Sequence, residues 1–158
     1  MEIVKIPKMS KQEYDAMIQE GCLSRIAFRG EKYPYIAPFL YVFDGTFLYF
    51  LSTKYGRKND LFKKNPYVSV EIDKYTPNLS CYTFVTMQGY LVQEEDGITK
   101  KIIRQKFVEM IRDKKLSQNI LAALGHEPSE PLEAIVSEER SNIWKLTGVV
   151  DIVALKNL

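Results

Sequence analysis

The chain has 158 residues, enough for one domain with its own hydrophobic core and too few for two domains of typical size. Hydrophobic residues make up 46% and charged residues 27%, which excludes a largely disordered protein. The net charge is only +2, with both signs interspersed, so electrostatics do not mark the chain as a binder of nucleic acid or membrane surfaces. We expect a single domain over residues 1–158.

Four further features indicate a cytoplasmic protein that neither enters a membrane nor carries a metal centre. Residues 1–7 lack the apolar run of a signal peptide, and no segment approaches the roughly 18 apolar residues of a spanning helix. Cys22 and Cys81 have neither metal-ligand nor redox CxxC spacing, so we expect both to be packing residues in a reducing compartment. His126, the single histidine, excludes sites that need two imidazoles and is expected to be a solvated loop residue.

The first half of the chain predicts a short helix followed by three strands. Ser10 and Glu13 form a capping box, and the helix that they begin ends at Gly21. The pattern then changes to apolar runs separated by turn residues, and the Asp-Gly pair at 44–45 is a strong hairpin signal. The expected strands are Cys22–Arg29, Tyr35–Phe43 and Thr46–Thr53.

The run from Phe47 to Leu51 is apolar at every position, so both faces of the third strand must be covered. Such coverage is typical of a barrel wall packed by helices or by a second subunit. It therefore favours a barrel over an open sheet.

The second half predicts three more helices or helical turns among further strands. A short helix follows Gly56, and a longer one shows apolar residues at 103, 107, 110 and 111. The acidic run at 94–96 is interpreted as a solvated hairpin tip. The expected helices are Arg57–Lys64, Ile98–Asp113 and Gln118–Leu124, and the expected strands are Tyr67–Asp73, Thr83–Gln93, Ala134–Ser137 and Ile143–Leu155. Strands in mostly hairpin order with intervening helices predict an α+β protein built on an antiparallel barrel of six or more strands.

The segment Ser52–Lys58 is the clearest candidate for a binding site. A buried strand ends in Ser52 and Thr53, turns through Gly56 and enters a helix that starts with Arg57 and Lys58. Helix N-termini suit phosphate, and side chains in the first turn tilt back toward the strand end. The four polar side chains are therefore expected to converge on one dianion. The alternative is a solvated basic helix start whose hydroxyls cap locally.

Several segments together resemble the pyridoxamine 5'-phosphate oxidase-like split-barrel flavoproteins, most closely the nitroimidazole-reductase-like branch. The segments that carry the resemblance are Gly21–Ala27, Tyr33–Phe39, Leu48–Thr53, Gly56–Lys58 and Asn65–Val70. The resemblance implies a Greek-key split barrel that forms a homodimer and holds FMN in the groove between its subunits.

The same resemblance implies roles for individual residues. Ser52, Arg57 and Lys58 match the residues that hold the FMN phosphate. Ala37, Pro38 and Phe39 match the strand that lines the isoalloxazine ring. Gln88 matches a polar contact to the flavin. Trp144 falls on the late strand that reaches across the dimer, with core packing as the alternative role.

Two departures from the family pattern narrow the function. Leu51 stands where the nitroimidazole-reductase branch often carries a histidine, and the segment Val149–Leu158 lacks the Arg-rich ending of enzymes that oxidise vitamin B6. These departures argue against nitroimidazole reduction and against vitamin B6 oxidation, and they leave the flavin inference in place. The resemblance thus implies an FMN-dependent oxidoreductase that passes electrons from a reduced nicotinamide to a small acceptor, with no catalytic residue identified.

Three alternatives remain open: a deazaflavin-dependent reductase, a flavin-binding electron carrier or sensor, and a nucleic-acid-binding barrel. The last would use the lysine pairs at 63–64, 100–101 and 114–115, which neighbouring acidic residues balance. We therefore expect no nucleic-acid partner.

Overall fold

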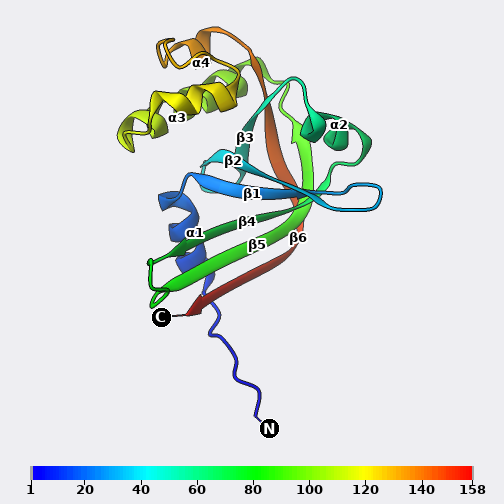
Figure 1. Cartoon of the computed structure of the whole chain (residues 1–158), viewed down its shortest axis with the longest axis vertical. Helices are drawn as coiled ribbons and strands as arrows, with labels where there is room; N and C mark the ends of the chain where they lie inside the picture. The colour runs from blue at the N-terminus through cyan, green and yellow to red at the C-terminus, as the bar shows by residue number, and fades with distance from the viewer. Residues whose placement is uncertain (1, 158) are drawn as a thin grey trace.

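The computed structural model describes residues 2–157, and its six strands form a closed antiparallel barrel (Figure 1). Met1 and Leu158, which the predicted domain includes, lie outside the described residues. The order around the barrel is β1-β2-β3-β6-β5-β4. The strands are β1 (Leu23–Phe28), β2 (Tyr35–Phe43), β3 (Leu48–Thr53), β4 (Tyr67–Tyr75), β5 (Tyr82–Gln93) and β6 (Ser141–Asn157). The predicted α+β antiparallel barrel with flanking helices is confirmed.

The helices lie around this barrel rather than within its wall (Figure 1). They are α1 (Lys11–Glu20), α2 (Arg57–Lys64), α3 (Gly97–Asp113), the 3-10 helix η1 (Gln118–Leu124) and α4 (Ala134–Ser137). Helix α2 connects β3 to β4, while α3, η1 and α4 form the long connection from β5 to β6. Among residues 2–157, no helix combines the length and the apolar character that crossing a bilayer requires.

Strand β3 is buried on both faces because it separates two hydrophobic cores. Leu48 and Phe50 belong to the core inside the barrel. Tyr49 and Leu51 belong to a second core beneath α3, η1 and α4. All six residues of β3 are buried, as the uninterrupted apolar run predicts.

Helix α1 packs against the core inside the barrel. The capping box is present, since Ser10 Oγ accepts from the Glu13 N–H and Glu13 accepts from the Ser10 N–H. Met17 and Ile18 contribute to the interior core. The Tyr41 hydroxyl donates to the Ile18 carbonyl at 2.7 Å, which ties the helix end to β2.

Two predicted elements in the β5–β6 connection are wrong. Residues 134–137 form the short helix α4 instead of a strand, because a four-residue apolar run carries too little periodicity to separate the two. The acidic run at 94–96 leads into α3 instead of forming a hairpin tip. Asp96 caps that helix by accepting from the Thr99 N–H at 2.9 Å.

Two single-residue expectations are also wrong. His126 is 4% exposed, so it is a buried residue instead of a solvated one. Cys81 is exposed, whereas Cys22 is partly buried against the second core. Burial of residues in loops depends on which elements pack over them, and local sequence does not report it.

Candidate functional site

The α2 corner, residues 52–58, is shaped by one glycine and one buried asparagine. Gly56 has φ +100°, a backbone conformation that residues with a Cβ rarely adopt. The Asn59 side chain is buried and its Nδ2 donates to the Lys54 carbonyl at 2.9 Å, which fixes the turn. Among the described residues no side chain caps the N-terminus of α2, so its first N–H groups lack a side-chain acceptor there.

Lys58 is half-buried at this helix start, and its ammonium lies over an aromatic ring. Its Nζ is 4.8 Å from the centroid of Phe39. Burial lowers the pKa of the Lys58 ammonium because the charged form loses water contacts. Arg57 is exposed, with its guanidinium carbon 5.3 Å from the centroid of Tyr35. Among residues 2–157, no ion pair involves either cation. The corner thus presents two cations without carboxylate partners.

The two hydroxyls at the end of β3 bond to local backbone. Ser52 is fully buried, and its Oγ donates to the Thr53 carbonyl at 3.1 Å. Thr53 Oγ1 donates to the Tyr55 carbonyl at 3.1 Å. Successive side chains of a strand point to opposite faces. Ser52 therefore shares the face of Phe50 and Thr53 shares that of Leu51, and the two hydroxyls do not converge.

An aromatic cluster connects Lys58 to the barrel interior. The Phe39 ring lies 5.7 Å from Trp144, and Phe62 of α2 lies 4.7 Å from the same indole. Trp144 is 0% exposed, and its buried Nε1 has no hydrogen-bond partner among the described residues. The indole is enclosed as a core residue, which is the alternative role expected for it.

The remaining predicted site residues face different directions. Ala37 and Phe39 are buried inside the barrel, while Pro38 between them is exposed. Gln88 is also exposed, opposite Ser69 of β4 and Asp151 of β6. Pro38 and Gln88 both point outward, but β1 and β4 separate their strands. Three strand spacings put them about 14 Å apart along the sheet.

The structure therefore brings together Lys58, Arg57 and the rings of Phe39 and Tyr35, and leaves Gln88 apart in the same chain. Sequence reasoning missed Tyr35 as the ring beneath Arg57, and it missed Asn59. An Asn in the first turn after a glycine is a signal for Asn59, because such side chains bond to nearby backbone.

A buried arginine supports the corner from the other side of β3. Arg104 of α3 is 2% exposed and donates to Ser141 Oγ at 3.0 Å and to the Ser141 carbonyl at 2.5 Å. Burial lowers the pKa of this guanidinium. Ser141 pairs directly with Thr53, so α3 fixes the strand end from which the corner turns.

Comparisons with known proteins agree with this architecture. The family model described as pyridoxamine 5'-phosphate oxidase matches residues 10–144. An uncharacterized protein of Rhizobium meliloti is 36% identical over 82 residues. These cover 52% of this chain and 54% of that protein, so the match spans about half the length of the curated relative.

Two solved structures share the fold over nearly their whole length. A FAD-binding protein from Mesorhizobium loti has a TM-score of 0.70 and 18% identity, covering 97% of this chain and 99% of that one. A FAD-binding protein from Mycobacterium smegmatis has a TM-score of 0.61 and 14% identity, covering 96% and 98%. At this identity the likeness concerns the fold alone.

Proposed function

The chain belongs to the pyridoxamine 5'-phosphate oxidase family, and from this premise we propose that it is a flavoprotein that holds FMN by its phosphate at the α2 corner. The observation that carries the proposal is Lys58, which is half-buried at an uncapped helix start and has no carboxylate partner within residues 2–157. A cation that has lost water contacts without gaining an anion is stabilised when an anionic ligand completes the site.

The groups at the corner fit a phosphate dianion. Arg57 and Lys58 supply two positive charges, and the first N–H groups of α2 supply donors with the helix dipole behind them. Each charge-assisted hydrogen bond contributes roughly 1.5–3 kcal/mol, and micromolar affinity requires roughly 8 kcal/mol. Three or four such bonds therefore account for most of that affinity.

Two neighbours in fold are named FAD-binding proteins, which supports a flavin as the ligand class. FMN is the form proposed here because its terminal phosphate carries two negative charges to match two cations. When bound, the isoalloxazine supplies the electron chemistry. The chain supplies the anchor for the phosphate at Lys58 and an outward-facing strand surface at Pro38.

The reaction proposed is transfer of electrons from a reduced nicotinamide to a small acceptor molecule. Its test is anaerobic mixing of the flavin-loaded protein with NADH or NADPH while the visible spectrum is followed. Bleaching within seconds supports an oxidoreductase. Bleaching over hours refutes the nicotinamide-dependent reaction and favours an electron carrier or sensor.

We propose further that two copies of the chain form a homodimer with the flavin between them. Val149, Val150 and Val153 lie close together in β6 and are 41%, 84% and 40% exposed. Exposed apolar side chains that lie close together are typical of a protein interface. A second copy also explains how Gln88 reaches a flavin anchored at Lys58, since the partner contributes it across the interface.

The binding proposal is tested by titrating the purified protein with FMN, FAD, riboflavin and a deazaflavin analogue, following flavin fluorescence. Tightest binding of FMN supports the proposal, and equal affinity for riboflavin refutes the phosphate anchor. Preference for the deazaflavin would reassign the cofactor. Light scattering of the wild type and of Val153→Glu tests the dimer: a dimer that the substitution dissociates supports the interface, and a monomeric wild type refutes it.

A further inference from the structure

The single histidine of the chain lies in a loop that packs back onto the start of β6. The ring of His126 is 1% exposed, and its backbone N–H donates to the Leu121 carbonyl at 2.9 Å. The preceding Gly125 has φ +88°, and a Cβ there would meet the Arg140 carbonyl at 2.9 Å. This close approach holds the loop against residue 140.

The imidazole of His126 is a buried polar group without a hydrogen bond. Neither ring nitrogen has a hydrogen-bond partner among residues 2–157. Nδ1 is 3.3 Å from Glu130 Oε2, but the contact lacks hydrogen-bond geometry. Buried polar groups are almost always satisfied, so an imidazole in this state indicates a missing partner.

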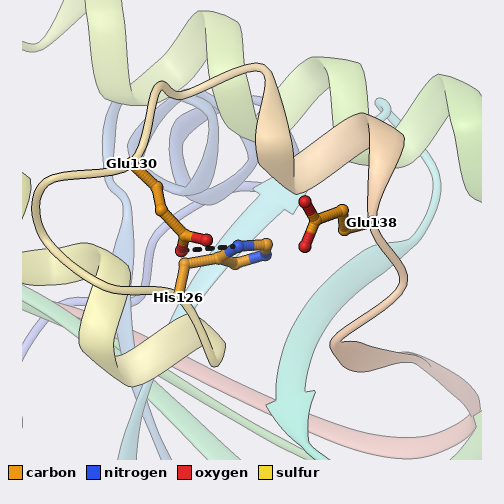
Figure 2. A group of neighbouring side chains, drawn as sticks. All are labelled: His126, Glu130 and Glu138. Carbon is orange, nitrogen blue, oxygen red and sulfur yellow. Dashed lines mark ion pairs between the residues drawn. The ribbon is translucent and has the colours of Figure 1, made fainter.

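Two carboxylates flank the ring. Figure 2 shows the side chains of Glu130 and Glu138 directed toward the imidazole of His126 from opposite sides. One potential ligand atom from each of the three residues lies within 4.8 Å of the others. One imidazole and two carboxylates are donors that zinc accepts, with one position of a tetrahedron left for water.

The spacing of two of these atoms already matches a shared ion. Ligands about 2.0–2.1 Å from a tetrahedral zinc ion lie about 3.3 Å apart. The separation of His126 Nδ1 and Glu130 Oε2 is 3.3 Å. Since the three ligand atoms lie within 4.8 Å of one another, Glu138 needs to move inward by at most about 1.5 Å to reach the same spacing. Its side chain is 47% exposed, so a rotamer change at the surface provides that movement.

Arg140 and the backbone N–H of Glu127 compete for the carboxylates, since both donate to Glu130 Oε2, at 3.0 and 2.6 Å. Arg140 Nη1 lies 2.8 Å from Glu130 Oε1, and its Nη2 pairs with Glu138. The guanidinium therefore neutralises both acids when no ion is present. Zinc must share these carboxylates with Arg140, so we expect weaker binding than in a closed four-ligand site.

We propose that His126, Glu130 and Glu138 bind one zinc ion in the connection between η1 and β6. The site shares no residue with the α2 corner, so a test that refutes zinc binding leaves the flavin proposal intact, and the reverse is also true. A bound ion would join the loop after η1 to the residues just before β6.

The test uses protein purified without a histidine tag and stripped of metal by a chelator. Calorimetric titration is expected to give one zinc ion per chain. His126→Gln and Glu138→Gln are each expected to weaken binding at least about tenfold. Glu127→Gln, an exposed acid in the same loop, is the matched control and should leave the affinity unchanged. Calcium and magnesium, which prefer all-oxygen sites, should give no comparable heat.

A second readout keeps the proposal testable if His126→Gln fails to fold. Because the chain has one histidine, its ring ¹⁵N signals are unambiguous, and zinc is expected to shift them at one equivalent. Ring signals that do not move at saturating zinc would overturn the proposal. Zinc binding that survives Glu138→Gln unchanged, or that is carried by Cys22 and Cys81, would overturn it as well.

Discussion

Replacing Lys58 with alanine removes the half-buried cation at the α2 corner while leaving the helix start in place. Alanine has the highest helix propensity, so α2 should persist. Lys58 has no ion pair to lose among the described residues, and its burial in the ligand-free chain carries a desolvation cost. We expect the free energy of unfolding to change by no more than about 1 kcal/mol.

The effect on FMN affinity should be much larger. Loss of one charge-assisted hydrogen bond costs roughly 1.5–3 kcal/mol, which corresponds to about a 10- to 150-fold rise in Kd. Riboflavin has no phosphate, so its Kd should change little. The difference between the two ligands isolates the phosphate contact from any general loosening of the site.

The assay is flavin fluorescence titration of wild type, Lys58→Ala and the control Lys63→Ala. Lys63 is exposed in the last turn of the same helix, so its removal matches the change in net charge without touching the corner. Equal weakening of FMN and riboflavin by Lys58→Ala would refute the reasoning. If Lys58→Ala and Lys63→Ala weakened FMN binding equally, the effect of Lys58→Ala would be one of net charge rather than of a phosphate contact.

Three further predictions concern stability, each measured by urea unfolding. Gly56→Ala should destabilise by about 1–3 kcal/mol through its positive φ, and Gly97→Ala, in open space at the start of α3, should not. Trp144→Ala should cost about 3–5 kcal/mol, and a loss below 1 kcal/mol would contradict its place in the core. Burial, helped by Asp73 and opposed by Arg25, raises the pKa of Glu71 to about 7. Between about pH 4.5 and 7 the folded state therefore keeps a proton on Glu71 that the unfolded state has released. The free energy of unfolding should fall as the pH rises through this range, and Glu71→Gln should remove that pH dependence.

Local signals were sufficient for much of the fold. Strand β2 and helix α2 have the predicted bounds. Turn residues flank β2, and α2 lies between Gly56 and Pro66. The short helix α4 was missed because four residues sample barely one helical turn. The burial of His126 was missed because it depends on how its loop folds back: the preceding Gly125 lies against the Arg140 carbonyl, and the ring lies 3.3 Å from Glu130.

The candidate site was predictable in position but not in detail. The order of strand, glycine and basic helix start located the corner. Ser52 and Thr53 were expected to converge, but adjacent residues of a strand point to opposite faces, and each hydroxyl bonds to local backbone instead. The ring beneath Lys58 comes from β2, and no local pattern connects Phe39 with residue 58.

The double burial of β3 has a mechanical consequence for the whole molecule. If the layer of α3, η1 and α4 detached from the barrel, Tyr49 and Leu51 of β3 would be exposed to water. The same strand also contributes Leu48 and Phe50 to the core inside the barrel. Loosening on either side is therefore transmitted to the residues that end this strand. We expect amide protons of β3 to be among the slowest to exchange, and the protein to melt as one unit rather than in stages.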